Sequence, residues 1–404
     1  MAYRILSLDG GGAWALIEVR ALIALYDEET TGHDVLADFD LVAANSGGSL
    51  VLGGLVEGLA LGDLLDYFED EAKRKSIFSP ASWVDRTFSD VTGMGPKYSA
   101  QNKLPAIEAL LSETGTKLLP QAISGVHRPG FPDVHLLIVG FDYDANRATF
   151  FRSATASGPQ WGQGDAAVNV TLAEAIHAST NAPVNYFDAP ATFPDHPGQR
   201  YWDGGLTGCN NPIVAAVTEA IVKGQSPDDI VALSLGTATV ALPAPTPADT
   251  NPAQAQFLRP VVNPGLVTDL RKLATAILDD PPDIASFLAH VMTGSGAGVP
   301  PPAVSRIVRM NPLISPMGTP GNWRAPGNAA TSMTGSQFQY LVQLDMDAVE
   351  QPQVNAIGAF TDLWLESGVR NQPIRMDGDT LNRELGYDSF QDAAAAWRRL
   401  KQLD

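Results

Sequence analysis

The sequence predicts an α/β fold, and two features of the 404-residue chain support this class. Short apolar runs of strand length alternate with longer stretches in which apolar residues recur at helical spacing, and this alternation is typical of a sheet with helices on its faces. Hydrophobic residues make up 45% of the chain, which is enough to build a sizeable core. The length fits one large α/β domain or two.

The expected elements follow this alternation from the first residues onward. Strands are expected at residues 3–8, 39–45, 134–142, 147–152, 230–236, 304–310 and 338–344. Helices are expected at residues 14–29, 48–60, 62–74, 100–112, 171–179, 212–223, 266–278, 348–367 and 389–402. The helix over 212–223 shows the signals clearly, because Asn211 suits the N-cap, Pro212 the first helical position and Gly224 the end.

A sharp turn is expected around Ser46, directly after an apolar run. The small residues Ala44 and Gly48 stand two positions before and two after it, and they let the backbone turn tightly from a strand into a helix. A serine in such a turn, called a nucleophile elbow, has its hydroxyl held clear of the sheet edge. Ser49 competes for this role, but Val51 two positions later is too bulky for the turn. Ser46 is therefore the candidate nucleophile.

A glycine run, Gly10, Gly11 and Gly12, follows the first expected strand and precedes a helical pattern. Loops of this kind leave backbone N–H groups unpaired, and these groups stabilise negative charge. Beside a nucleophilic serine they would form an oxyanion hole. The spacing from Gly10 to Ala15 also fits a dinucleotide-binding turn, although Asp9 would place a carboxylate near the pyrophosphate. A non-catalytic nucleotide-binding protein is therefore one alternative.

A third turn of small residues, Asp203-Gly204-Gly205, predicts on its own no more than a tight turn. The chain has six histidines, and none follows His290, so the histidine that an ordinary α/β hydrolase carries after its acid is missing. A serine-aspartate dyad needs no histidine, because the carboxylate can take the hydroxyl proton directly. His177 is expected to be a buried core histidine with satisfied hydrogen bonds.

In this order the three motifs resemble the patatin-like phospholipase family. The resemblance implies a three-layer α/β/α sheet with flanking helices and a C-terminal helical extension. It also implies lipid acyl hydrolysis without a metal or other cofactor, with an acyltransferase using the same acyl-serine as the alternative. The roles it assigns are Ser46 as nucleophile, Asp203 as base, Gly10, Gly11 and Gly12 as oxyanion hole, and Ala44, Gly48, Gly204 and Gly205 as support for the two turns.

The chain departs from the family pattern after the glycine run. The family usually carries a basic residue and then glycine there, whereas Trp14 and Ala15 stand in this chain. The missing cation weakens the case for a bound substrate phosphate, so neutral lipids and small esters are both open as substrates.

The resemblance divides the chain near residue 240. We expect residues 1–240 to form the catalytic core and residues 241–404 to add lid-like loops, strands and helices that complete the same domain. Three stretches rich in proline and glycine, at 242–265, 293–303 and 315–335, are the expected loops. Long loops in a compact enzyme are often lids, and a peripheral helical cap with linkers explains them equally well.

Charge and cysteine content narrow the expected partners. A net charge of −19 disfavours nucleic acid and gives no attraction to anionic membranes, so transient contact with a membrane surface would depend on apolar side chains. Cys209 is the only cysteine, which excludes an intramolecular disulfide and suits a reducing compartment. The sequence shows no signal segment and no apolar stretch approaching 18 residues, so a cytoplasmic location is expected.

Overall fold

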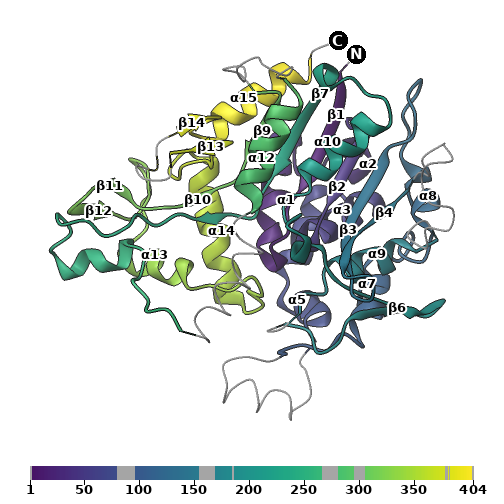
Figure 1. Ribbon diagram of the computed structural model, residues 1–404, viewed down its shortest axis with the longest axis horizontal. Coiled ribbons are helices and arrows are strands. Elements are labelled where there is room, and N and C mark those ends of the chain that lie inside the picture. Colours follow the sequence, from purple (N-terminus) through teal and green to yellow (C-terminus); the bar gives the residue numbers. More distant parts are fainter. Residues whose placement is uncertain are drawn as a thin grey trace.

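The computed structural model of the chain describes residues 2–79, 96–153, 169–183, 186–265, 281–294, 305–377, 381 and 383–402. Its centre is an eight-stranded sheet (Figure 1). The strands are β1 (Tyr3–Leu8), β2 (Leu41–Ala44), β3 (His135–Asp142), β4 (Arg147–Arg152), β5 (Ala191–Phe193), β6 (His196–Asp203), β7 (Ile230–Leu235) and β9 (Ile307–Met310). Their order is β5-β6-β3-β2-β1-β7-β9, with β4 paired to β3.

The middle of the sheet is parallel and one side is antiparallel. β1 pairs in parallel with β2 and β7, β2 with β3, and β7 with β9. β3 pairs antiparallel with β4 and β6, and β6 with β5. Because the carboxyl ends of parallel strands meet at one edge, the turns after β1, β2, β7 and β9 lie together there, where open α/β sheets bind their ligands.

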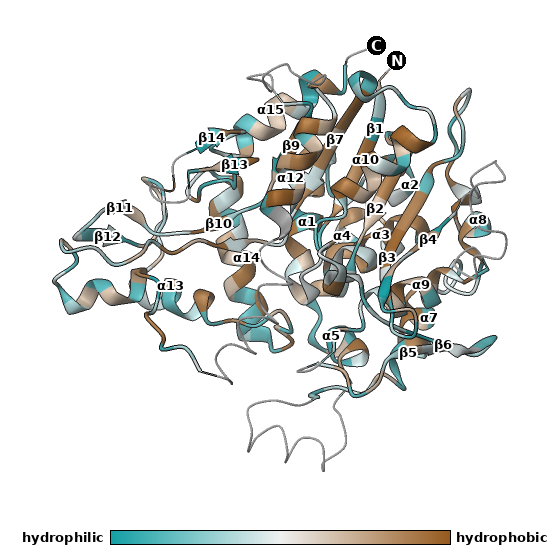
Figure 2. Ribbon diagram, in the orientation of Figure 1, coloured by the Kyte–Doolittle hydropathy of each residue, from teal (hydrophilic) through white to brown (hydrophobic). Residues whose placement is uncertain are grey.

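Helices cover both faces of the sheet. The main ones are α1 (Leu16–Tyr26), α2 (Gly32–Ala37), α3 (Ser46–Glu57), α4 (Leu61–Glu69), α5 (Glu71–Ile77), α7 (Lys103–Leu110), α8 (Leu119–Ala122), α9 (Leu172–Ser179), α10 (Ile213–Val222), α12 (Pro281–Met292), α13 (Gly335–Val342), α14 (Gln351–Leu365) and α15 (Phe390–Leu400). The central strands are strongly hydrophobic along their length, as expected for a sheet buried on both sides (Figure 2).

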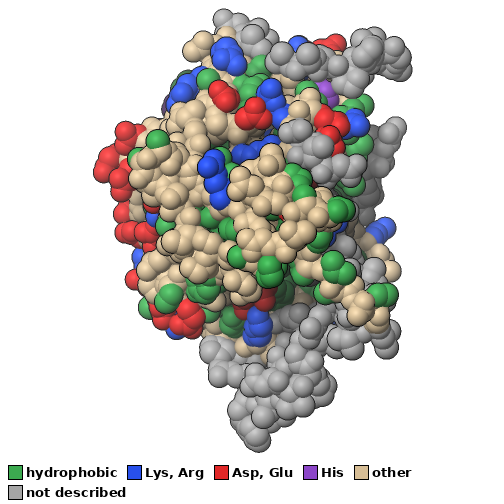
Figure 3. Space-filling model, turned by 90° about the vertical axis from the view of Figure 1, so that its left-hand side faces the viewer, with side chains coloured by type: hydrophobic (Ala, Val, Ile, Leu, Met, Phe, Trp, Pro, Cys, Tyr) green, Lys and Arg blue, Asp and Glu red, His purple; other side chains and the backbone are tan. Residues whose placement is uncertain are grey.

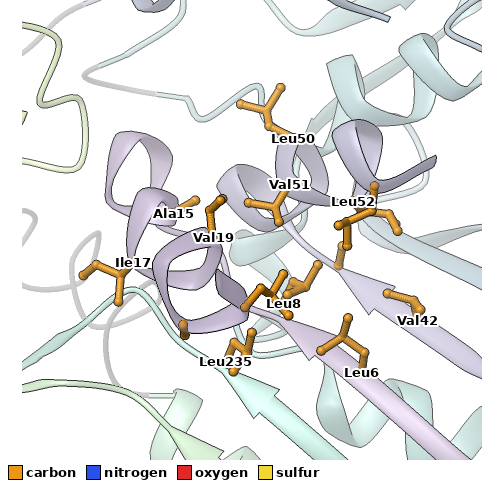
Figure 4. Packing of buried hydrophobic residues seen from close by; sticks show 14 of the residues in the cluster. Leu6, Leu8, Ala15, Ile17, Val19, Val42, Leu50, Val51, Leu52 and Leu235 are labelled. Carbon is orange, nitrogen blue, oxygen red and sulfur yellow. The ribbon is translucent and has the colours of Figure 1, made fainter. Parts of the chain in front are cut away.

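Alternate strand residues feed two separate cores. Leu6 and Leu8 belong to the larger core, which includes buried residues of α1, α3, α9 and α14. Ile5 belongs to the smaller core, beneath α10 and α12. Figure 4 shows Leu6, Leu8 and Leu235 directed toward α1 and α3. The protein is thus a three-layer α/β/α structure, as the sequence predicts.

The C-terminal part adds to this sheet and extends beyond it. β9 lies far along the chain yet pairs with β7, and α14 packs on α1. Short strands form small sheets outside the centre: β8 (Thr239–Val240) with β10 (Leu313–Ile314), β11 (Met317–Thr319) with β12 (Asn322–Arg324), and β13 (Arg375–Met376) with β14 (Arg383–Leu385). On the face that they border, hydrophobic side chains are scattered among polar ones (Figure 3).

Three expected elements differ from the sequence prediction or lie outside the described residues. The strand expected at 338–344 is wrong, because these residues belong mainly to α13, which begins with a capping box between Thr334 and Gln337. The helix expected at 62–74 is two helices, since Asp70 has extended backbone and caps α5 through the Lys73 amide. The helix expected at 266–278 lies outside the described residues.

No helix in the described residues is both long enough and apolar enough to cross a membrane. The same residues contain no cluster of histidine, cysteine and carboxylate side chains that could hold a metal ion.

Candidate active site

Ser46 stands where β2 turns sharply into α3. Its φ of 46° is in the left-handed region, which a non-glycine residue adopts only under constraint from its surroundings. Gly48 explains why the turn needs a small residue, because a Cβ there would lie 2.6 Å from the carbonyl oxygens of both Leu8 and Asp9. α3 can therefore approach β1 only at this glycine. The geometry is that of the nucleophile elbow expected from the sequence.

Ser49, the competing serine, is occupied elsewhere. It is fully buried, and its hydroxyl donates to the carbonyl oxygen of Ser46 at 2.6 Å. Ser46 is 7% exposed and lines a cavity. The two serines therefore differ in access and in hydrogen bonding.

Asp203 ends β6, a strand that the sequence analysis did not anticipate. It pairs with Gly140 of β3, and this pairing brings the carboxylate to the elbow. The Ser46 side chain favours the charged form of that carboxylate and so acts to lower its pKa. Oδ1 of Asp203 also accepts from the Gly205 amide at 2.8 Å and from Nδ2 of Asn45 at 3.3 Å. The structure thus brings the two ends of the expected dyad together.

Burial sets the protonation behaviour of Asp203. The carboxyl group is 2% exposed, and its desolvation raises the pKa above the usual value for aspartate. Hydrogen bonds from Gly205 and Asn45, together with the Ser46 side chain and the charge of Lys103, oppose that rise in pKa. A raised pKa suits a general base, because proton transfer is most effective when the pKa of the base approaches the working pH.

A polar network fixes the backbone of the elbow. The Ser46 amide donates to Oγ of Ser179 at 2.9 Å, and the Ser179 hydroxyl donates to Oδ1 of Asn45 at 3.4 Å. Nδ2 of Asn45 also donates to Oδ1 of Asn210 at 3.3 Å. Sequence analysis assigned no role to Asn45 or Ser179, because their contacts join distant parts of the chain.

The amides of the glycine run differ from one another. The Gly10 amide donates to the carbonyl oxygen of Asn210 at 2.8 Å, so it is engaged within the protein. Among the described residues, the amides of Gly11, Gly12 and Gly47 have no backbone acceptor. Gly12 N lies 2.8 Å from the position of a Cβ on Gly47, so these two glycines are in close contact. The residue after a nucleophile commonly contributes such an amide.

His177 forms no hydrogen bond with Ser46 or with Asp203. It is 3% exposed, and its Nδ1 has no hydrogen-bond partner among the described residues, so the expectation of a fully satisfied histidine does not hold for this atom. Burial, with a smaller contribution from the charge of Lys103, lowers the pKa of His177 to about 3. The imidazole is therefore neutral near pH 7.

Two cavities meet at the elbow. A small one of about 20 Å³ lies over Ser46, and we call it the Ser46 cavity. A larger one of about 200 Å³ is lined mainly by apolar side chains of α4, α5 and α7, and we call it the apolar cavity. The residues that line both are Gly12, Leu50, Ile77 and Phe78. The apolar cavity is thus next to the serine hydroxyl.

A short C-terminal segment, which we call the 345–347 strap, covers the glycine run. The carbonyl oxygen of Met346 accepts from the Ala13 amide at 3.1 Å, and that of Asp345 accepts from Nε1 of Trp14 at 3.0 Å. Met346 also lines the Ser46 cavity. Trp14, where the family usually has a cation, therefore anchors the strap.

Side chains from earlier in the chain, at residues 97, 98 and 186, also hold the strap. Lys97 forms ion pairs with both Asp345 and Asp347, at 3.0 and 3.1 Å. The Tyr98 hydroxyl donates to Asp347 at 2.6 Å, and the Tyr186 hydroxyl donates to Asp345. Met346, which lines the Ser46 cavity, therefore belongs to a segment that is fastened on both sides.

Comparisons with known proteins agree with the fold and the motifs. The family model described as "Patatin-like phospholipase" matches residues 6–217, which is more than half of the chain and contains the glycine run, Ser46 and Asp203. The chain is 40% identical over 60 residues to an intracellular phospholipase A2 of Caenorhabditis elegans. That match spans 15% of this chain and 5% of the relative.

A solved structure is also similar at a low level. VipD from Legionella pneumophila is 10% identical, with a TM-score of 0.34 over 92% of this chain and 68% of that one. This similarity is too low to carry a structural comparison.

The fold and the strand-turn-helix serine define an α/β protein with a site at the carboxyl edge of its sheet. Within that class, the chain belongs to the patatin-like phospholipase family.

Proposed function

We propose that the chain hydrolyses acyl esters of lipids or small alcohols through a dyad of Ser46 and Asp203. The observation that carries this proposal is the position of the buried Asp203 carboxylate beside the left-handed elbow, where Nδ2 of Asn45, the residue before Ser46, donates to Oδ1 of Asp203 at 3.3 Å. A serine hydroxyl at its ordinary pKa is a weak nucleophile, and an adjacent base activates it. No histidine is required in this arrangement.

The chemistry has two halves. Asp203 takes the Ser46 proton while Oγ attacks the ester carbonyl, and the alcohol leaves with a proton returned from Asp203. A water molecule then attacks the acyl-serine, with Asp203 again as base, and releases the acid. The amides of Gly11, Gly12 and Gly47 are the proposed donors to the oxyanion, at about 3 kcal/mol for each well-placed donor. Gly10 supports this loop through its bond to Asn210.

The apolar cavity is the proposed site for the acyl chain. An engineered apolar cavity of about 150 Å³ accepts benzene, so 200 Å³ has room for roughly eight carbon atoms. Each buried methylene adds about 0.8 kcal/mol of favourable transfer free energy. Short and medium chains would therefore be held fully, and longer chains would extend beyond this cavity.

The cellular location and other partners are also proposals. The single cysteine and the relative described as intracellular support action inside the cell, and the strongly acidic charge supports a lipid or small ester as partner rather than nucleic acid.

The test combines covalent labelling with hydrolysis. A fluorophosphonate probe and a p-nitrophenyl octanoate assay are applied to the wild type, Ser46→Ala and the matched control Ser49→Ala. We expect the wild type to be labelled and to hydrolyse the ester. Ser49→Ala should keep most of the labelling and the hydrolysis, and folded Ser46→Ala should show neither. Undiminished activity in Ser46→Ala contradicts the proposal. An alcohol acceptor added to the assay separates hydrolysis from acyl transfer by the product formed.

A further inference from the structure

Lys103, the first residue of α7, is a buried cation that the dyad chemistry does not use. Its side chain is fully buried, and Nζ donates to the carbonyl oxygen of Thr180 at 2.6 Å. Nζ also lies 3.8 Å from the centre of the Phe187 ring, within range of a cation–π interaction. Lys103 lines the Ser46 cavity together with Ser46 and Gly47.

The position of Lys103 carries an energetic cost. An ammonium group taken out of water requires compensation by an opposite charge, and no carboxylate of the described residues forms a direct ion pair with it. Burial acts to lower the pKa of Lys103 well below its usual value, and the one charge that acts in the opposite direction, toward the ammonium form, is that of Asp203. In the same way, Lys103 is the charged side chain that opposes the raised pKa of Asp203.

We propose that Lys103 is the counter-ion of the Ser46–Asp203 centre and acts as a positioning residue for the charge that moves within it. This inference rests on the proposed hydrolysis. It differs from the dyad itself, because Lys103 accepts and donates no proton in the reaction.

The charge balance of the reaction explains the role. Before attack, the single negative charge is on the Asp203 carboxylate. When Oγ of Ser46 bonds to the ester carbon, its proton passes to Asp203 and the carbonyl electron pair moves to oxygen, so the same charge now lies on the oxyanion. An ammonium that lines the same cavity keeps the centre neutral in both states. The Ser46 cavity has room for only about one water molecule, so screening is weak and a fixed opposite charge has a large effect.

Other titratable side chains near Lys103 are uncharged or have other partners. On α9, His177 is neutral because of its lowered pKa, and Glu174 caps its own helix through Thr171. On α5, Arg74 directs its donors to Phe68, Val349 and Gln351. The remaining titratable groups on the elements and loops packed around it are Glu71, Lys73, Lys75, Lys97, Tyr98, Glu108, Tyr186, Asp188, His196, Arg200 and Tyr201. The carboxylate whose charge opposes the lowering of the Lys103 pKa is that of Asp203.

The test follows the pH dependence of fluorophosphonate labelling and of kcat/KM. Lys103→Met removes the charge and keeps a side chain of similar length, and Lys103→Gln also keeps a donor for the Thr180 carbonyl. In both variants, we expect the acid limb of each profile to shift to higher pH by about one unit. The reason is that they lack the positive charge of Lys103, which favours the carboxylate form of Asp203. Lys103→Arg should restore the limb toward its wild-type position. Lys117→Met, at an exposed lysine, is the matched control and should leave both profiles unchanged.

A second measurement needs no variant. The ¹⁵N chemical shift of Lys103 Nζ in the wild-type protein should be that of an ammonium throughout the pH range in which the enzyme is active. A neutral amine in that range overturns the counter-ion role, and so does an unshifted acid limb in folded Lys103→Met. If the wild type is not labelled at Ser46 at all, the proposed hydrolysis fails instead, so the two outcomes are distinguishable.

Discussion

Asn45, which directly precedes the proposed nucleophile Ser46, donates from Nδ2 to Oδ1 of Asp203, the proposed base, at 3.3 Å. The elbow and the dyad aspartate, 158 residues apart in sequence, are thereby joined through a single amide. Oδ1 of the same side chain accepts from the Ser179 hydroxyl, and Oγ of Ser179 in turn accepts from the Ser46 amide. The position of Ser46 and the ionisation of Asp203 therefore depend on one residue.

Asn45→Ala should lower kcat/KM by about 10- to 100-fold, because a hydrogen bond to a charged group contributes about 1.5–3 kcal/mol. The acid limb should also move to higher pH, since the Asn45 hydrogen bond opposes the raised pKa of Asp203. Steady-state kinetics between pH 4 and pH 9 measures both effects. Asn355→Ala, at an exposed asparagine of α14, is the control. An Asn45→Ala enzyme with wild-type kinetics would exclude this role.

Gly48→Ala should destabilise the protein, because the added Cβ meets the carbonyl oxygens of Leu8 and Asp9 at 2.6 Å. Overpacking of this kind costs about 1–3 kcal/mol or more. Gly198→Ala is the matched control, because a Cβ there has nothing within 4 Å. Thermal unfolding should show a lower Tm for Gly48→Ala alone, with loss of fluorophosphonate labelling. Equal Tm values in the two variants would contradict the close approach of α3 to β1.

His177 should be dispensable for catalysis. Its pKa is lowered to about 3 by burial, so it carries no charge change near pH 6.5. We expect His177→Gln to keep hydrolysis within about tenfold of the wild type and to leave the acid limb in place. Asp203→Asn, measured beside it, should lose several orders of magnitude because serine then has no base. A His177→Gln enzyme as inactive as Asp203→Asn would require a triad.

The carboxylates behind the glycine run should make stability depend on pH. Asp9 and Glu18 are both buried, and desolvation raises the pKa of Asp9 to about 6 and that of Glu18 well above its usual value. Because these folded-state pKa values exceed the unfolded ones, the stabilising contribution is complete below about pH 4 and is lost as pH rises through about 6 and beyond.

The measurement is the Tm of the wild type and of Glu18→Gln between pH 4 and pH 8. The wild type should lose more stability over this range than Glu18→Gln, which can still accept from the Asp9 amide without titrating. Glu29→Gln, at an exposed glutamate, should follow the wild type. Parallel curves for all three proteins would show that the pair does not titrate in this range.

A local pattern predicts the sharp turn from β2 into α3. Its requirement for small residues at positions 44 and 48 is a property of six consecutive residues, and the contact of Gly48 with Leu8 and Asp9 is the physical reason. β6 was not predicted, because Asp203 followed by glycines favours a turn, whereas pairing with β3 keeps the strand extended up to that residue. Tertiary pairing here outweighed the local signal.

Lys103 shows a different limit of the sequence. A lysine at the start of an amphipathic helix is usually solvated, and nothing in residues 100–112 distinguishes this one. Its burial comes from Thr180 and Phe187, which are more than 70 residues away in the chain. The strand wrongly predicted at 338–344 has a similar cause, because a short apolar run fits both periods until the capping residues at 334 and 337 are considered.

The long-range contacts of the glycine run also determine when its structure can be completed during synthesis of the chain. Asp9 pairs with Arg309, 300 residues later, and Trp14 bonds to the 345–347 strap, 331 residues later. At roughly 5–20 residues per second, a ribosome needs about 15–60 s to cover that distance. A growing chain thus presents its serine long before the amides beside it are fixed. The proposed active site is therefore completed only after residue 347 has been synthesised.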